Sequence, residues 1–387
     1  MNESNAFRME VRAWLDANCP AEMRGPMTEA DHCFGGKRWV FKNEAQRQWL
    51  ARMAEKGWTA PEWPREYGGG GLTADEAAVL REEMARINAR SPLTSLGVWM
   101  LGPALLKFGT EAQKRKYLPP IVRGEVRWCQ GYSEPNAGSD LVSLQTKAEL
   151  ISDEFVINGQ KIWTSYGHLS DAMFCLVRTD PSKARHDGIS FLLIDDMSTP
   201  GLQASPLRLI SGNEHFSQVF FDNVKVPKEN LVGTLNRGWD VAKYLLLFER
   251  QAIGGVHARA ELPAEFALRE MDAAALRAEP MLRGQIATLD LELSAFDALL
   301  ERYQDEAAAG VQLGAKSSLL KYYSSELDVK RQELMLAILG NAGQDLEGPK
   351  ARTAIDWLNA LTTRIGGGTS EIQLNIIAKR VLELPGG

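Results

Sequence analysis

The spacing of apolar residues divides this chain into three stretches. Over residues 1–122 apolar positions recur every three or four residues, which is typical of amphipathic helices. The clearest helix start is Thr73-Ala-Asp-Glu76, a capping box in which the hydroxyl and the carboxylate bond free amides of the first turn. Leu80, Met84 and Ile87 follow at helical spacing, so this pattern predicts a helix from Thr73 onward.

The segment 104–120 predicts two short helices. Gly109 is expected to end the first, and Pro119-Pro120 to break the second. The proline pair therefore indicates the approach to a domain boundary.

From about 123 to 235 the pattern changes to short β-prone runs separated by turn residues. Phe155-Val-Ile157 and Gln160-Lys-Ile-Trp163 flank Asn158-Gly159, a pair that favours the type I′ turn of a hairpin. Residues 173–177, 189–194 and 218–221 are further predicted strands. Several strands at this spacing indicate a sandwich or a barrel.

Helical spacing returns after Gly238 and continues to the end of the chain. The predicted helices cover residues 239–268, 280–306, 316–339 and 370–382, and four such helices form a bundle. The chain is therefore predicted to be α+β and mostly helical. Its domains are a helical domain at 1–122, a β-barrel-like domain at 123–235 and a four-helix bundle at 236–387.

Composition and charge narrow the class of protein. The net charge is -6 and the basic residues are not clustered, so nucleic acid is not a favoured partner. No apolar run approaches the roughly 20 residues that cross a bilayer, and the first ten residues do not resemble a signal peptide. The four cysteines lack metal-site spacing, so we expect free thiols, no metal and a cytoplasmic location.

Two short motifs in the central stretch can bind a ligand. Gln130–Asp140 combines glycines, a proline and hydroxyl residues, which lets backbone amides approach a flat or anionic group, although an exposed turn has the same composition. Trp163-Thr-Ser165 places a large ring beside two hydroxyls, which suits stacking on an aromatic cofactor. A core tryptophan is the alternative for this second motif.

A third motif precedes the last predicted helix. Arg364-Ile-Gly-Gly-Gly-Thr-Ser-Glu-Ile-Gln373 would place free amides and the positive end of a helix dipole in front of an anionic group, with Thr369 or Ser370 as the cap. A glycine-rich hinge is the alternative interpretation.

Glu249 is the candidate general base. Its neighbours one helical turn away are Leu245, Leu246, Ala252 and Ile253, all apolar. Loss of water around a carboxylate raises its pKa toward the range in which it accepts a proton at neutral pH. A structural ion pair with an arginine from another helix is the alternative.

Together these motifs make the chain resemble the acyl-CoA dehydrogenase family over nearly its whole length. The motifs that carry the resemblance are Ser133–Asp140, Asn158–Trp163, Val226-Pro-Lys-Glu-Asn-Leu-Val-Gly233 and Gly367–Gln373, in the family's order and spacing. The resemblance implies FAD as the cofactor, held between the central domain and the bundle and across a subunit interface. It implies the following cofactor contacts: Gln130, Tyr132, Ser133, Gly138, Ser139, Trp163, Thr164, Ser165, Gly367, Thr369 and Glu371.

The resemblance also implies a reaction and its partners. The family removes an α-proton and a β-hydride from an acyl-CoA in fatty acid metabolism and lipid degradation, and passes electrons to electron-transferring flavoprotein. Many members place the catalytic glutamate where this chain has Gly367, whereas a minority have Glu-Arg in the first bundle helix, as in Glu249-Arg250. Glu249 is therefore the expected base, with Ser139, Arg250 and Gly367 on the substrate side.

Two departures from the family pattern favour an alternative. The family's Arg-x-x-Phe-Gly is absent from 255–285, and its Gln-x-x-Gly-Gly appears as Ala337-Ile-Leu-Gly-Asn341. These changes weaken the expectation of a homomeric FAD site and favour pairing with a sister subunit, including a non-catalytic subunit that completes the FAD site of a partner chain. The expected assembly is a homo- or hetero-oligomer, a dimer or a tetramer. An acyl-CoA oxidase of the same fold is a further alternative.

Overall fold

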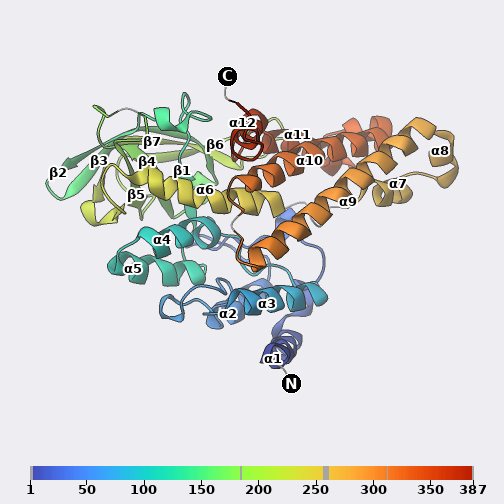
Figure 1. Cartoon of the computed structure of the whole chain (residues 1–387), viewed down its shortest axis with the longest axis horizontal. Coiled ribbons are helices and arrows are strands. Elements are labelled where there is room, and N and C mark those ends of the chain that lie inside the picture. The colour runs from blue at the N-terminus through green and yellow to red at the C-terminus, as the bar shows by residue number, and fades with distance from the viewer. Residues whose placement is uncertain (1–2, 184, 256–260, 312, 386–387) are drawn as a thin grey trace. The chain divides into compact units, whose positions relative to one another are not determined.

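The chain folds into two compact units. The computed structural model describes residues 3–183, 185–255, 261–311 and 313–385, with the backbone alone at 3–4, 29, 249–255 and 307–308. One unit comprises Met1–Leu207 and Glu214–Leu245, and the other comprises Arg208–Asn213 and Leu246–Gly387. The first unit contains helices and a sheet, and the second is helical (Figure 1).

The N-terminal part of the first unit is helical, as predicted. Its α-helices are α1 Glu3–Asn18, α2 Glu44–Glu55, α3 Ala74–Arg86, α4 Gly102–Phe108 and α5 Glu111–Val122. The Thr73 capping box is confirmed, because the Thr73 hydroxyl accepts from the Glu76 amide and the Glu76 carboxylate accepts from the Thr73 amide. Buried apolar side chains from α1, α2 and α3 form the core of this part, which includes Leu15, Trp49 and Leu80.

The predicted break at Pro119-Pro120 is wrong. Both prolines lie inside α5, which continues to Val122. Ile121 and Val122 are completely or almost completely buried, so tertiary packing maintains the last turn that proline disfavours locally. Gly109 ends α4 as predicted, with an extended backbone.

The rest of the first unit is built on a sheet. Its strands are β1 Trp128–Gly131, β2 Lys147–Ile151, β3 Glu154–Ser165, β4 Ala172–Arg178, β5 Ile189–Ile194, β6 Leu202–Leu207, β7 Phe216–Pro227 and β8 Leu231–Val232. The order is β6-β7-β3-β2-β4-β5-β8, and β1 pairs in parallel with β4. β4 is buried on both faces up to Val177, and β5 along its whole length, so both read as continuous apolar runs in the sequence. The predicted central sheet region is therefore present, in green and yellow in Figure 1.

The hairpin predicted at Asn158-Gly159 is wrong, because β3 runs through both residues. The register of β3 with β7 shifts between Ile157 and Gly159, which marks a β-bulge. A side chain at Gly159 would approach the Cα of Thr146 to 2.8 Å, and the Gly159 φ is +143°. Glycine is therefore needed for close packing against Thr146, and the turn between β2 and β3 lies at Ser152 and Asp153 instead.

The second unit contains the C-terminal helices. It contains the end of α6, which spans Gly238–Gly255. The helices that follow are α7 Pro263–Glu270, α8 Ala273–Ala278, α9 Pro280–Ala308, α10 Ser317–Leu339, α11 Ala351–Thr363 and α12 Ser370–Arg380. The predicted helices 280–306, 316–339 and 370–382 correspond to α9, α10 and α12. The predicted stretch 239–268 holds two helices, because α6 ends at Gly255 and α7 begins at Pro263 after the extended Leu262. α11 was not predicted.

The cysteines and the hydrophobicity of the helices also bear on the expectations from the sequence. All four cysteines are buried and have free thiols, as expected. Within the described ranges, each helix is too short or too polar to span a bilayer.

Candidate functional site

The first predicted motif begins in β1 and continues into the loop after it. Gln130 is half-buried at the end of β1, Tyr132 is buried, and Ser133 is half-buried. Gly138 and Ser139 are exposed. A side chain at Gly138 would meet no atom within 4 Å, so this part of the loop has open space in front of it.

An ion pair between Glu134 and Lys161 fixes this loop to β3. The Lys161 Nζ lies 2.8 Å from Glu134 Oε1 and donates to the Tyr132 carbonyl at 3.0 Å. The amides of Gln145 and Thr146 donate to the same carboxylate at 2.7 and 2.9 Å. Burial alone would raise the pKa of Glu134, but the Lys161 charge and these hydrogen bonds hold that pKa below its usual range.

The ion pair brings two separately predicted motifs together. Glu134 belongs to Ser133–Asp140 and Lys161 to Asn158–Trp163, and neither was predicted as a site residue. Lys161 is fully buried, and the Ile162 amide donates to the Ser133 carbonyl at 2.9 Å. The two motifs were recognisable in the sequence, but the pairing of Glu134 with Lys161 depends on how the loop after β1 lies against β3. Motif Gln130–Asp140 is therefore more than an exposed turn.

Trp163 has its ring on the surface of the first unit. A second register shift, between Lys161 and Thr164, places Trp163 at a φ of +59°. The side chain is 55% exposed, with Phe216 packed edge-on at 5.9 Å. The core-tryptophan interpretation is therefore wrong for this unit, and the exposed ring is available for stacking.

Thr164 and Ser165 follow Trp163 in β3. Thr164 is fully buried, and its hydroxyl has no hydrogen-bond partner among the described residues. Ser165 is half-buried and pairs with Phe216 in β7. A buried hydroxyl without a partner is unusual in a folded protein and is compatible with a polar group supplied by a ligand.

The third predicted motif forms the loop between α11 and α12 in the second unit. Gly367 and Gly368 have φ of +67° and +92°, a backbone conformation that favours glycine. Thr369 is the N-cap of α12 and accepts from the Ile372 amide. The buried Gln373 side chain donates to the Gly367 and Gly368 carbonyls at 2.9 and 3.3 Å, so side-chain hydrogen bonds connect both glycines to α12.

Glu326 of α10 also holds this loop. Its carboxylate accepts from Arg364 Nε at 2.9 Å and from the Ser370 hydroxyl at 2.6 Å, on the two sides of the glycines. Glu326 carries no local signal of this role in the sequence, because 38 residues separate it from Arg364. The carboxyl of Glu371 accepts from its own amide and from the Thr369 hydroxyl, and these bonds lower the pKa of Glu371.

The predicted base belongs to α6. The backbone of Glu249 and Arg250 is helical, and their side chains lie outside the described set. Leu245, one turn earlier, is fully buried. The role of Glu249 therefore stays a prediction that rests on its place in α6 and on its neighbours in the sequence.

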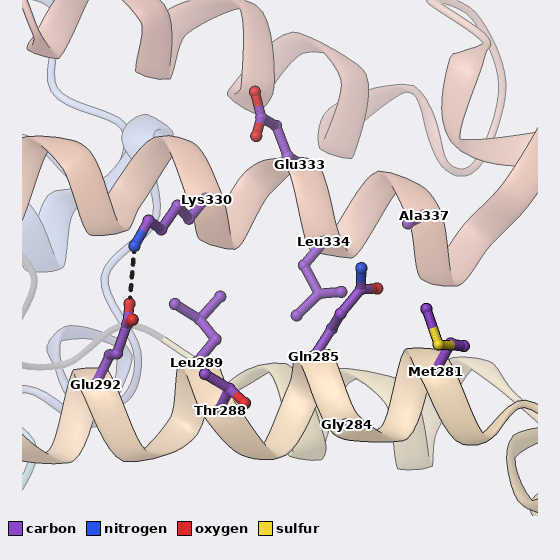
Figure 2. Close-up of a pocket in the computed structure, with 10 residues that line it drawn as sticks. All are labelled: Met281, Gly284, Gln285, Thr288, Leu289, Glu292, Lys330, Glu333, Leu334 and Ala337. Carbon is purple, nitrogen blue, oxygen red and sulfur yellow. Dashed lines mark hydrogen bonds and ion pairs between the residues drawn. The ribbon is translucent and has the colours of Figure 1, made fainter.

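A separate hollow of about 550 Å³ lies between α9 and α10 (Figure 2). Leu289 and Leu334 lie between the two helices, and Lys330 bonds Glu292 at 3.0 Å at one end. The complete lining is Met281, Gly284, Gln285, Thr288, Leu289, Glu292, Lys330, Glu333, Leu334 and Ala337. None of the predicted site residues lines this hollow, and it contains Ala337, one of the two departures from the family pattern.

Comparisons with known proteins agree with this architecture. The acyl-CoA dehydrogenase N-terminal domain matches residues 1–125, the middle domain matches 129–224 and the C-terminal domain matches 236–382. Acyl-CoA dehydrogenase IpdE1 of Mycobacterium tuberculosis is 37% identical over 100% of this chain and 99% of its own length.

Two solved structures are similar over nearly the full length. A steroid acyl-CoA dehydrogenase, Tcur3481-Tcur3483, has a TM-score of 0.79 and 30% identity, covering 99% of this chain and 98% of that chain. The ChsE4-ChsE5 complex from Mycobacterium tuberculosis has a TM-score of 0.76 and 29% identity, covering 100% of this chain and 99% of that chain.

These comparisons define the class of protein, a flavoprotein oxidoreductase that acts on acyl-CoA. This chain belongs to the acyl-CoA dehydrogenase family, whose members act in lipid metabolism.

The described residues fit the family's cofactor, FAD. The exposed Trp163 ring offers a stacking surface, and the buried Thr164 hydroxyl lacks a partner among the described residues. In the second unit the buried side-chain oxygen of Gln373 likewise accepts no hydrogen bond from the described residues. Within each unit, these are features that a polar or aromatic group of a ligand would satisfy.

Proposed function

We propose that this chain catalyses the FAD-dependent α,β-dehydrogenation of an acyl-CoA thioester to the trans-2-enoyl-CoA, with Glu249 as the base that removes the α-proton. FAD would supply the acceptor for the β-hydride and a ribityl hydroxyl that helps to polarise the thioester carbonyl. Trp163, Thr164 and Ser165 would hold its ring. Thr369 and Glu371 would lie toward its diphosphate.

The substrate side of the site is assigned from the family resemblance. Ser139 would face CoA, and Arg250 would contact CoA or the substrate beside the base. Gly367 stands where many family members have the catalytic glutamate, and without a side chain it would leave room for the acyl group.

The observation that carries this proposal is the combination of Gly367 with Glu249. Gly367 cannot act as a base, so the proton must be removed by another residue. Glu249 lies in α6, one turn after the fully buried Leu245. A carboxylate among apolar neighbours loses water, which raises its pKa and makes it a better base at neutral pH.

Substitution Glu249→Gln tests the base. The holoenzyme variant should keep its yellow colour, but anaerobic addition of substrate should no longer bleach the flavin absorbance. A loss of about 100-fold or more in the bleaching rate is expected from removal of a general base. The screen should include straight-chain, dicarboxylic and steroid acyl-CoA thioesters, because solved relatives include a steroid acyl-CoA dehydrogenase.

Asp240→Asn is the matched control. Asp240 is an acid of the same helix, paired at the surface with Arg237 and Lys243. This variant should bleach at the wild-type rate. Wild-type bleaching by Glu249→Gln would remove Glu249 from the proposed role.

A second candidate function is a non-catalytic subunit that completes the FAD site of a partner chain. The two departures from the family pattern favour it, because Ala337 stands where the family has glutamine and the family's Arg-x-x-Phe-Gly is absent from residues 255–285. This candidate predicts little flavin in the chain purified alone, and a complex whose activity is unaffected by Glu249→Gln.

The electron acceptor distinguishes the proposed dehydrogenase from the remaining alternative, an acyl-CoA oxidase. A dehydrogenase should pass electrons to electron-transferring flavoprotein and react slowly with oxygen, whereas an acyl-CoA oxidase should consume oxygen at the turnover rate. Oxygen uptake with and without that acceptor separates the two.

A further inference from the structure

Arg127 is a buried cation of the first unit, placed directly before β1. Only 7% of the residue is exposed. Its amide donates to Asp171 Oδ2 at 2.9 Å, and its carbonyl accepts from the amides of Asp171 and Ala172 at 2.9 and 3.1 Å. These backbone bonds fix Arg127 at the point where β1 and β4 begin.

The Arg127 guanidinium lies over two aromatic rings. Its central carbon is 4.3 Å from the centre of the Phe34 ring and 4.6 Å from the centre of the Tyr166 ring. The two rings contact each other, with centres 5.0 Å apart. Aromatic faces attract a cation but carry no net charge, so they hold the guanidinium in place without neutralising it.

The positive charge of Arg127 is only partly balanced. Within the described residues its side chain forms no ion pair, and its buried Nη2 has no hydrogen-bond partner. Asp171 attracts the guanidinium through charge alone, because its Oδ2 accepts from the amides of Lys37 and Arg127, while Arg38 opposes it as a second nearby cation. Burial lowers the pKa of Arg127, yet an arginine side chain stays protonated at neutral pH.

This charge lies beside the end of β3 that carries the expected flavin contacts. Tyr166, on which the guanidinium rests, directly follows Ser165 in the chain. Tyr166 has a φ of +51°, and its amide donates to the His215 carbonyl at 2.7 Å. Trp163 also has a positive φ, and two bulky residues in this conformation within four positions are unusual and typical of functional sites.

We propose that Arg127 raises the reduction potential of the bound flavin, as a fixed positive charge that favours the reduced ring. This inference rests on the proposed function, in which Trp163, Thr164 and Ser165 hold that ring. Transfer of the β-hydride brings two electrons and one proton to a neutral ring, so the ring gains one negative charge. A buried cation is little screened by water, so it stabilises this charge and makes the flavin a better hydride acceptor.

Three substitutions of Arg127 test the charge in the holoenzyme. Arg127→Met keeps a long side chain against Phe34 and Tyr166 but removes the cation. The reduction potential, measured anaerobically against a reference dye, should fall by the equivalent of an about tenfold smaller equilibrium constant for reduction, which is about 30 mV for two electrons. Arg127→Gln should shift the potential in the same direction, and it provides the test if the methionine variant does not fold. Arg127→Lys retains a positive charge and should keep the wild-type potential.

Arg38→Gln is the matched control. Arg38 is a neighbouring arginine whose Nη2 donates to the Ser170 carbonyl at 3.0 Å. Its side chain is exposed, so water screens its charge and the substitution should leave the potential unchanged. A merely structural role of Arg127 would lower the flavin content or the free energy of unfolding of the variants without moving the potential.

The possible results separate the inference from the proposed function. A wild-type potential in Arg127→Met and Arg127→Gln, or an equal fall in Arg127→Lys or in Arg38→Gln, would overturn the inference and leave the proposed function intact. A wild-type chain that binds FAD but is bleached by none of the acyl-CoA thioesters would overturn the proposed function, whereas the potentials would still decide the role of Arg127. A wild-type chain that binds no FAD would overturn both.

Discussion

At the scale of single residues, Trp163 is held in an unfavourable backbone conformation. Its φ of +59° lies in the left-handed region, which costs a bulky residue on the order of 1–3 kcal/mol. The bulge between Lys161 and Thr164 imposes this conformation, and the ring remains exposed as a result. Such strain persists where the surrounding structure enforces it. Here the strained residue exposes its aromatic ring on the surface of the first unit.

We expect Trp163→Ala to weaken flavin binding, because the variant loses the stacking surface. A loss of roughly 1–3 kcal/mol would raise the dissociation constant of FAD by about 5- to 150-fold. The measurement is the flavin absorbance that remains after dialysis. Leu150→Ala, which removes another exposed apolar side chain of the same sheet, should retain the wild-type flavin content. Equal retention by both variants would exclude stacking on Trp163.

The position of Trp163 in a motif could be predicted from the sequence, but its exposure and its neighbours could not. Asn158–Trp163 and Ser133–Asp140 are recognisable as motifs, and both lie in the first unit as expected. The ion pair Glu134–Lys161 that joins them depends on the loop after β1 lying against β3, which a local pattern does not contain. The exposure of Trp163 likewise follows from a bulge in β3.

At the scale of elements, local propensity failed where tertiary contacts were stronger. Asn158-Gly159 has the composition of a hairpin turn, yet Gly159 is required for close packing on Thr146 in the middle of β3. Pro119-Pro120 likewise lies inside α5, where buried Ile121 and Val122 maintain the helix. Where propensity and packing agree, as in the Thr73 capping box and α9, the prediction was confirmed.

Glu83 is the main charged contact between α1 and α3. Its buried carboxylate accepts from Arg12 Nε and Nη2, both at 2.9 Å, and from Arg86 Nε at 2.6 Å. Hydrogen bonds from Arg12, opposed by burial and supported by Arg86 and Arg8, lower the pKa of Glu83 from its ordinary 4.5 to about 2. This pKa difference corresponds to about 3 kcal/mol of the free energy of unfolding.

We predict that this contribution has a defined pH range. Because the folded pKa is depressed, the stabilisation is complete above the unfolded pKa and is lost as the pH falls from about 4.5 toward 2. Glu83→Gln should lower the free energy of unfolding at pH 7 and flatten its decline below pH 5. Urea unfolding at several pH values measures both effects. Glu82→Gln, an exposed neighbour paired with Arg8, is the control and should change the curve little.

At the scale of the whole molecule, the order of helical, sheet and helical regions was predictable, but the two-unit organisation was not. Hydrophobic spacing changes at the start and at the end of the sheet region, and these changes are visible in the sequence. The predicted site residues are divided between the units, with Gln130–Ser165 in the first and Gly367–Glu371 in the second. Long-range contacts within one unit, such as Glu326 with Arg364, carry no sequence signal because each residue alone is an ordinary charged position.

The surface of the second unit leads to our last prediction, that the chain forms a dimer or a tetramer. Ile365, Leu374, Leu382 and Leu384, in α12 and the segments beside it, are between 44% and 67% exposed. Large apolar side chains that are exposed within one segment of the chain are common at interfaces. Light scattering of the purified chain should give a dimer or tetramer, and Leu374→Glu with Leu382→Glu should shift it to a smaller species. The control Leu150→Glu, in β2, should leave the size of the assembly unchanged. A wild-type chain that is monomeric at micromolar concentration would contradict the prediction.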